Sequence, residues 1–382
     1  MKNKLKLYTF HSIWILILTI LICVFVKALS FSTMFLDPIG QALNGFRFTD
    51  TYFYVQNADS KTSDYNPDIL LFDISNCYSR TEIAAALQRI SDLNPKAIGM
   101  DVIFGQGGVQ DSISNDSLIR VVQRSPKLVT AMRVIQSQNG FSLERSFFAD
   151  TTKCSEACVN VENETVRTFG STVTVGNLTL PSFAGEIVKM AYPDMYDDFV
   201  KRGNKTELIN YKALSFDKIH IYEPFDTFDI EDRIVLIGDF EDLRDFHGVP
   251  AMIDGSRRIP GTTIHAYAIS TVTKDRLINQ MSDTEGLLIG IALTFLFSIV
   301  CARIFLKYDK VSGLLVNVWQ LILLFFLTII GGIAFLRWNT NLNLLYAMLG
   351  TGLVGFTADL WFCFSITKIY KNTFGRIEPK FK

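Results

Sequence analysis

The sequence predicts an α/β extracytoplasmic domain with a partly parallel sheet, together with an α-helical transmembrane bundle. Three observations lead to this fold class. Of the 382 residues, 49% are hydrophobic, and they are concentrated at the two ends of the chain. In the middle, short continuous apolar runs each end in an aspartate, and such runs are typical of strands buried on both faces of a sheet. A helical pattern between the first two runs indicates a strand-helix-strand unit.

The charge distribution separates the same regions. Residues 30–285 contain 24 Lys and Arg against 35 Asp and Glu, a net charge of −11. The rest of the chain contains 13 basic and 3 acidic residues, a net charge of +10. No nucleic acid is expected as a partner, because a nucleic-acid-binding domain needs a basic patch on its folded surface. The apolar ends exclude an ordinary soluble protein and a wholly disordered one.

The first apolar run predicts a transmembrane helix at residues 12–29, after a cytoplasmic N-terminus at 1–11. A helix of about 20 residues crosses a bilayer, and the run at Ile13–Val26 with its flanks has that length. The alternative is a cleaved signal peptide. The absence of a convincing small-x-small cleavage site favours an uncleaved anchor. Both interpretations export the residues that follow.

Three further apolar runs predict transmembrane helices at 286–306, 311–336 and 343–366. Lys and Arg cluster before the first span, around the loop between the second and third spans, and after the fourth. Basic residues in short loops stay on the cytoplasmic side. We therefore expect residues 30–285 outside and both termini in the cytoplasm, including a tail at 367–382. Membrane lipid is then one partner of this multi-pass protein.

The exported region is predicted to alternate strands and helices. Asp68–Asp73 and Lys96–Phe104 are predicted buried strands, paired in parallel through a right-handed crossover. Ser79 and Glu82 mark the start of the helix between them, and Asn94-Pro95 marks its end. The other expected elements are a juxtamembrane helix and an extended segment within 30–66, a helix at 116–123, a strand at 127–134, a β-rich region to about 175, a helix at 182–191, a strand at 233–239, and a helix from 264 to about 277 that leads into the second span.

Three of the predicted strands place an aspartate at or near the carboxyl end, namely Asp73, Asp101 and Asp239. Ligands of open α/β sheets bind just outside that edge, so these are candidate ligand-binding residues. A buried carboxylate needs partners. The candidate partners are Arg80, which begins the first predicted helix, and Arg244, Asp245 and His247, which follow the last strand. The alternative is a purely structural role, in which the acids cap helices and pair with arginines.

Two cysteine and two intramembrane positions also stand out. Cys154 and Cys158 could form a small disulfide in an oxidising compartment, or they could be free thiols on a loop. Two cysteines without a nearby third and fourth ligand are weak evidence for zinc, and neither a metal nor a cofactor is expected. Asp359 lies well inside the last span, where it could pair with Arg303 or reach water near the interface.

Several of these segments resemble, in their order and spacing, the type 2 CHASE sensory domain (cyclases/histidine kinases associated sensory extracellular). They are Asp68–Asp73, Arg80, Pro95–Phe104, Arg233–Gly238, Arg244-Asp245 and Pro260–Ala266. The resemblance implies a periplasmic sensor module of a receptor in the bacterial cytoplasmic (inner) membrane. Such modules usually precede a cytoplasmic kinase or nucleotide-cyclase domain. Here only 16 residues follow the last predicted span, so no output domain is expected.

The expected function is therefore that of a membrane-anchored sensor with an unknown small ligand or envelope component. Without an output domain, it is expected to signal through its bundle to a separate cytoplasmic or membrane protein. The alternative is a non-enzymatic scaffold that docks an envelope partner. No catalytic residues are expected, because the sequence has no P-loop, no G-x-S-x-G motif and no H-E-x-x-H motif.

Overall fold

The computed structural model describes residues 2–32, 48–58, 64–105, 112–137, 140–160, 165–308, 311–374 and 378. The chain forms two compact units. Phe48–Ile278 form the α/β unit, and residues 1–47 together with 279–382 form the apolar-helix unit.

A seven-stranded sheet forms the centre of the α/β unit, in the order β10-β1-β11-β2-β3-β4, with β5 also paired to β3. β3 and β4 are antiparallel, whereas the other pairs are parallel. The predicted partly parallel sheet is therefore confirmed. In chain order the strands are β1 (Asp64–Asp73), β2 (Ala97–Met100), β3 (Leu128–Ser137), β4 (Gly140–Arg145), β5 (Ser155–Cys158), β10 (Leu214–His220) and β11 (Ile234–Gly238).

The strand order corrects one expectation from the sequence. β1 and β2 are not neighbours, because β11 lies between them and pairs with both. A strand-helix-strand unit fixes the parallel direction and the hand of the crossover. It leaves open whether a strand from later in the chain enters between the two, and here one does.

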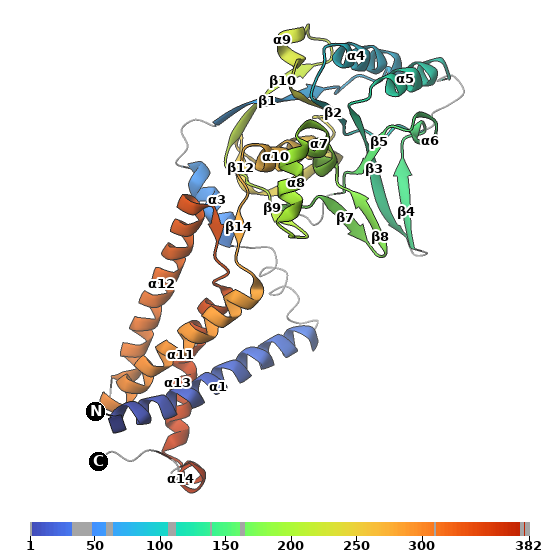
Figure 1. Ribbon diagram of the computed structural model, residues 1–382. Coiled ribbons are helices and arrows are strands. Elements are labelled where there is room, and N and C mark those ends of the chain that lie inside the picture. Colours follow the sequence, from blue (N-terminus) through green and yellow to red (C-terminus); the bar gives the residue numbers. More distant parts are fainter. Residues whose placement is uncertain are drawn as a thin grey trace. The chain divides into compact units, whose positions relative to one another are not determined.

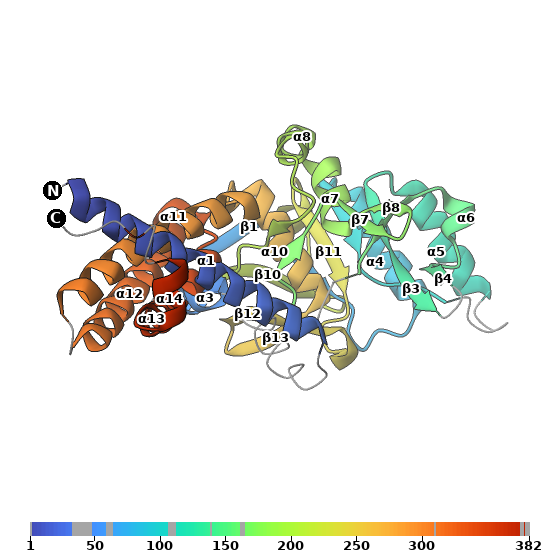
Figure 2. The ribbon, with the colours of Figure 1, turned by 90° about the horizontal axis from the view of Figure 1, so that it is seen from below.

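Helices cover both faces of this sheet (Figure 1). α4 (Arg80–Asp92) and α5 (Ser112–Arg124) cover one face, and α7 (Phe183–Ala191) and α10 (Gly261–Thr273) cover the other, as the view from below also shows (Figure 2). α4 begins as predicted, since the Ser79 side chain accepts a hydrogen bond from the Glu82 amide at 3.3 Å.

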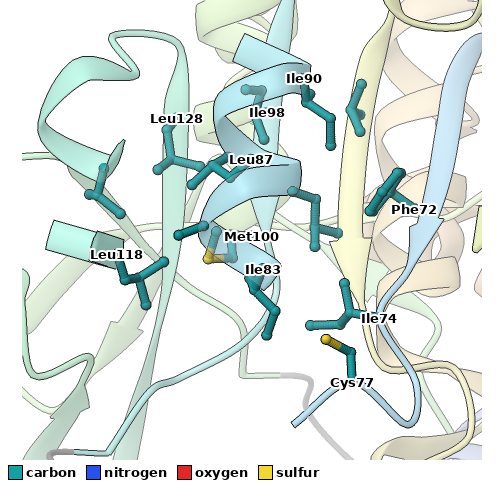
Figure 3. Close-up of a cluster of buried hydrophobic side chains, with 14 of the residues drawn as sticks. Phe72, Ile74, Cys77, Ile83, Leu87, Ile90, Ile98, Met100, Leu118 and Leu128 are labelled. Carbon is teal, nitrogen blue, oxygen red and sulfur yellow. The ribbon is translucent and has the colours of Figure 1, made fainter. Parts of the chain in front are cut away.

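One apolar core of this unit lies between the sheet and the helices α4 and α5. Leu87 and Ile90 of α4 point toward Phe72 of β1 and Ile98 of β2, and all four are fully buried (Figure 3). Burying one such side chain contributes about 1.5–3 kcal/mol. On the opposite face Gly99 leaves room for α7, because a Cβ there would lie 2.5 Å from the Ile187 side chain.

The helix α10 ends earlier than predicted. It stops at Thr273, and the amides of the next residues turn back onto its last carbonyls, with Asp275 in the left-handed region at φ 50°. The following helix, α11, begins only at Asp283, where Ser282 and Glu285 form a capping box. The expectation of one helix running to about 277 and into the second span is therefore wrong, because the chain closes α10 with its own cap.

The remaining elements of the α/β unit are short. They are α3 (Phe48–Ala58), α6 (Ala149–Thr152), β6 (Thr168–Phe169), β7 (Thr172–Val175), β8 (Leu178–Pro181), α8 (Pro193–Lys201), β9 (Glu207–Leu208), α9 (Thr227–Ile230), a 3₁₀ turn at Leu243–Asp245, β12 (Phe246–Ile253) and β13 (Ser256–Pro260). The sequence pattern did not predict α8, β10 or the β12–β13 hairpin.

Four helices of the apolar-helix unit are long and apolar enough to cross a membrane, and each overlaps one predicted span. They are residues Lys4–Phe25 of α1 (Lys2–Ser32), α11 (Asp283–Lys307), α12 (Ser312–Trp338) and α13 (Leu345–Ser365). The short elements of this unit are β14 (Asn279–Gln280), β15 (Thr340–Asn341) and α14 (Lys368–Thr373).

Small residues bring α11 and α13 together. A Cβ at Gly290 would lie 2.9 Å from the backbone nitrogen of Ala347, and one at Gly350 would lie 2.1 Å from Thr294 Oγ1. In lipid no hydrophobic driving force brings helices together, so they associate through close packing, which small residues allow.

Candidate functional site at the carboxyl edge of the sheet

The sheet order brings the three predicted aspartates to one stretch of its edge. Asp73 ends β1 and lies opposite Gly238 of β11, so Asp239 follows immediately beside it. Asp101 follows β2, and its amide donates to the Ile237 carbonyl of β11 at 2.9 Å. Neighbouring strands are about 4.8 Å apart. The side chains nevertheless divide into two groups with different surroundings.

The first group, called the Ser75 group here, consists of Asp73, Ser75, Lys218 and Asp239. Asp73 is 4% exposed. Its Oδ1 accepts hydrogen bonds from the Ser75 amide, at 2.8 Å, and from the Ser75 hydroxyl. Its Oδ2 lies 2.7 Å from Lys218 Nζ. Burial raises the pKa of Asp73, but the ion pair with Lys218 and the bonds from Ser75 outweigh it and hold the pKa below its usual value.

The Ser75 hydroxyl joins two carboxylates. Its oxygen lies 2.9 Å from Asp239 Oδ1 and accepts a bond from the Phe240 amide at 2.9 Å. A hydroxyl has one proton, so Ser75 can donate to Asp73 or to Asp239 but not to both. Asp239 is half-buried and also accepts the Glu241 amide at 2.9 Å. The group can therefore accept hydrogen bonds from the hydroxyl or ammonium group of a ligand, at Asp239.

The second group, called the α10 group here, gathers at the first turn of α10. Thr262 Oγ1 donates to Asp101 Oδ2 at 2.8 Å, and the Gly261 amide donates to Asp245 Oδ2 at 3.0 Å. Two glycines make this approach possible. A Cβ at Gly238 would lie 2.1 Å from Thr262 Oγ1, and one at Gly261 would lie 2.8 Å from the Asp245 carboxylate. The N-terminus of a helix favours nearby negative charge, but burial at the same place opposes it.

Two histidines complete the α10 group. His247 Nε2 lies 3.5 Å from Asp245 Oδ1. His265 is 8% exposed, and burial lowers its pKa although Asp101 and Asp245 act in the opposite direction. Burial also disfavours the charged form of Asp101, and for a carboxyl group this raises the pKa. The group therefore favours a neutral imidazole at His265 and opposes ionisation at Asp101, whereas the Ser75 group stabilises an ionised Asp73.

The two predicted arginine partners lie elsewhere. Arg80 donates to the Gly105 carbonyl at 2.7 Å and to Asn115, and its guanidinium lies 5.2 Å from the centre of the Phe147 ring. Arg244 has a side chain that is 91% exposed, and it pairs with Asp242 at 2.8 Å. Within the described ranges, no contact joins either arginine to a strand-end aspartate.

The sequence pattern missed three residues that organise this edge, namely Ser75, Lys218 and Thr262. Ser75 follows Asp73 by two positions, which is the spacing of a side chain that bonds to a nearby amide in an Asx turn. Thr262 lies two residues before the predicted helix start at 264, whereas the observed helix α10 begins at Gly261. No sequence signal indicates Lys218, because apolar and polar residues do not alternate regularly in β10. The position of β10 beside β1 depends on the tertiary fold.

The candidate disulfide does not fit the strand that separates its cysteines. Cys154 and Cys158 are free thiols at the two ends of β5. Four extended residues span about 13 Å, whereas disulfide-bonded residues have Cα atoms about 4.4–6.8 Å apart. The disulfide is therefore incompatible with β5, and the alternative of two free thiols agrees with the structure.

In the apolar-helix unit, Asp359 of α13 faces Gly313 of α12, where a Cβ would lie 3.6 Å from its Oδ1. No ion pair between Asp359 and Arg303 is formed among the residues that the structure describes. The same residues contain no group of three or more His, Cys, Asp or Glu side chains that could hold a metal ion.

Comparison with known proteins gives one match. Residues 46–300 match the family model described as the CHASE2 domain. No match was found among curated proteins or among solved structures.

Proposed function

The chain belongs to the CHASE2 domain family, and on that premise we propose that it is a membrane sensor that binds a ligand at the carboxyl edge of its sheet and signals to a separately encoded partner. CHASE2 domains are extracellular sensory domains rather than catalytic ones. With four helices that could span a membrane, the chain is a membrane protein with an extracytoplasmic sensory domain. Ligand, partner and direction of signalling belong to the proposal.

The observation that carries the proposal is the attachment of α10 to the sheet edge. The first turn of α10 is bonded to Asp101 and Asp245, and the last turn leads, through residues 274–278, to the end of the α/β unit. Those linking residues are tied to the unit, since the Asn210 amide group donates to the Arg276 carbonyl at 2.9 Å. A ligand that competes for the strand-end carboxylates would therefore act on the helix that precedes the first C-terminal span.

Such a ligand can shift the protein only if it binds two conformations with different affinities. The Ser75 group supplies one possible difference, because its single hydroxyl proton can lie on either of two carboxylates. A ligand donor at Asp239 would leave that proton to Asp73.

The test replaces Asp73, Asp101 and Asp239 together by Asn in the full-length chain. Partners are captured in mild detergent from cells grown under different envelope conditions and are quantified by mass spectrometry. We expect a condition-dependent partner for the natural sequence and no such dependence for the triple variant. Asp242→Asn is the matched control, since Asp242 lies at the same edge but pairs with the exposed Arg244. An unchanged response in the triple variant would remove this edge from the proposal.

A scaffold is the second candidate, and one observation favours it. Tyr78 is 91% exposed, Leu243 is 77% exposed, and the Arg244 side chain is 91% exposed, all in loops that follow strands at the carboxyl edge. Aromatic and arginine side chains are enriched among the residues that dominate protein interfaces. A stoichiometric partner that is captured under every condition, and equally by the triple variant, would favour the scaffold over the sensor.

A further inference from the structure

A cavity of about 50 Å³ lies beside the α10 group, on the face of the sheet that α7 and α10 cover. A single water needs roughly 10–15 Å³ of such space, so the cavity has room for more than one. Its walls are mainly apolar and include Val166, Phe183, Ile264 and Ala268, while His265 and Thr168 bring polar groups to it.

His265 is a polar wall residue of this cavity that makes no hydrogen bond to another described residue. It is 8% exposed, and its ring meets the Phe183 ring edge-on with 4.9 Å between the centres. Within the described part of the chain, no hydrogen bond is made to either ring nitrogen. Buried polar groups almost always have a hydrogen-bond partner, from the protein or from a bound molecule.

Two other polar side chains of the wall, Ser182 and Asn160, are hydrogen-bonded to the protein backbone. Ser182 donates to the Gly170 carbonyl and accepts the Gly185 amide at 3.0 Å. Asn160 accepts the Val134 amide at 2.6 Å and donates to the Val134 carbonyl at 2.9 Å. These two serve the protein's own backbone, whereas His265 is available to an occupant of the cavity.

We propose that this cavity binds a small uncharged amphipathic molecule of the alcohol or phenol type, with its hydroxyl on His265 and its apolar part against Phe183 and Ile264. The apolar walls disfavour a charged ligand, because an ion would lose its hydration there without a counter-charge. The neighbouring Asp245, whose charge acts on His265, further disfavours an anion.

The role of this site rests on the proposed function, because the bound alcohol or phenol would be the ligand of a sensory domain. Ile264, His265 and Ala268 lie on successive turns of α10, the helix whose first turn is bonded to the strand-end carboxylates. An occupant would therefore contact the same helix that the carboxylates hold.

The test uses the full-length protein in lipid nanodiscs with ¹⁵N-labelled histidine. The chain has only four histidines, so at most four imidazoles are observed, and His265→Phe assigns the signal of His265. The probe is 1-butanol. We expect a saturable shift of the His265 signal, with the signals of His11 and His220 unchanged.

Ala268→Val is the variant that fills the cavity from α10, and Ala184→Val fills it from α7 if the first fails to fold. Each adds two methyl groups to a lining position, and we expect 1-butanol binding to weaken at least tenfold. Ala85→Val makes the same change at an exposed position of α4 and is expected to leave binding unchanged.

Two results would overturn the proposal. One is the absence of a saturable shift in the natural sequence, which would mean that the cavity holds water only. The other is the same shift in a filled variant, which would place the alcohol elsewhere. Saturable binding at His265 that leaves partner capture unchanged would support the site and count against the proposed sensory role, so the two failures are distinguishable.

Discussion

The Ser75 group and the α10 group lie at the same edge of one sheet, yet they shift the pKa values of their aspartates in opposite directions. Asp73 has a cation, Lys218, and two bonds from Ser75, and its pKa is lowered. The carboxylate of Asp101 accepts one described hydrogen bond, from Thr262, and burial raises its pKa. A strand-end aspartate is therefore not a uniform signal. What packs on the edge decides whether it is a charged binding group or a buried structural one.

The difference has a simple origin in the elements that reach the edge. β10 runs beside β1 and brings a lysine, whereas α10 packs on β1 and β11 and brings a helix N-terminus, whose threonine bonds to Asp101. A lysine stabilises the ionised carboxylate directly. A helix end offers dipoles and excludes water, and exclusion of water opposes ionisation.

The largest predicted effect comes from Gly238→Ala, which separates α10 from the edge. The new Cβ would lie 2.1 Å from Thr262 Oγ1 and 3.0 Å from Thr262 Cβ, so the helix or the strand must shift. Overpacking of this kind destabilises by about 1–3 kcal/mol. We expect a lower thermal unfolding midpoint of the full-length protein in detergent.

Two companions to Gly238→Ala separate local overpacking from a general glycine effect. Gly105→Ala places a Cβ where no atom of the described residues lies within 4 Å and should leave the midpoint nearly unchanged. Adding Thr262→Ala to Gly238→Ala should recover part of the loss, because it removes the nearest atom. Equal losses in the single and double variants would contradict the close helix-strand contact.

A smaller effect is expected from Asp73→Asn, which tests the Ser75 group. The amide can still accept a bond from Ser75, but Lys218 loses its ion pair, and we expect a destabilisation of about 1 kcal/mol. The measurement is again the unfolding midpoint at neutral pH. Asp242→Asn, at a half-buried position of the same edge whose partner Arg244 is exposed, should change the midpoint little. Comparable losses in both variants would show that the buried group has no special role.

The smallest effect concerns the pH dependence of the α10 group. The folded-state pKa of His265 lies below its ordinary value of 6.5, so its contribution to stability is present above pH 6.5 and is lost as the pH falls. His265→Gln should therefore flatten the decline of the unfolding midpoint between pH 7 and pH 5. The carboxyl of Asp101 contributes with the opposite sign, since its raised pKa disfavours folding as the pH rises above 3.8. An identical pH profile in His265→Gln would refute the effect.

Particular residues show how far the sequence could predict the candidate site. The positions of Asp73, Asp101 and Asp239 followed from three apolar runs, because strands buried on both faces leave a continuous pattern. Their partners did not follow. The bond from Thr262 to Asp101 joins residues 161 positions apart, and no local pattern encodes such a distance. Arg80 and Arg244 are close to the aspartates in sequence, but in the fold both contact other residues.

The amino-acid sequence by itself determined the apolar helices, the buried strands and the start of α4, since each depends on hydropathy, periodicity or a cap within a few residues. Only the tertiary structure decided that β11 enters between β1 and β2 and that His265 lines a cavity. These features depend on which distant segments pack together. Packing is a property of volumes and contacts over the whole unit, which a local pattern does not specify.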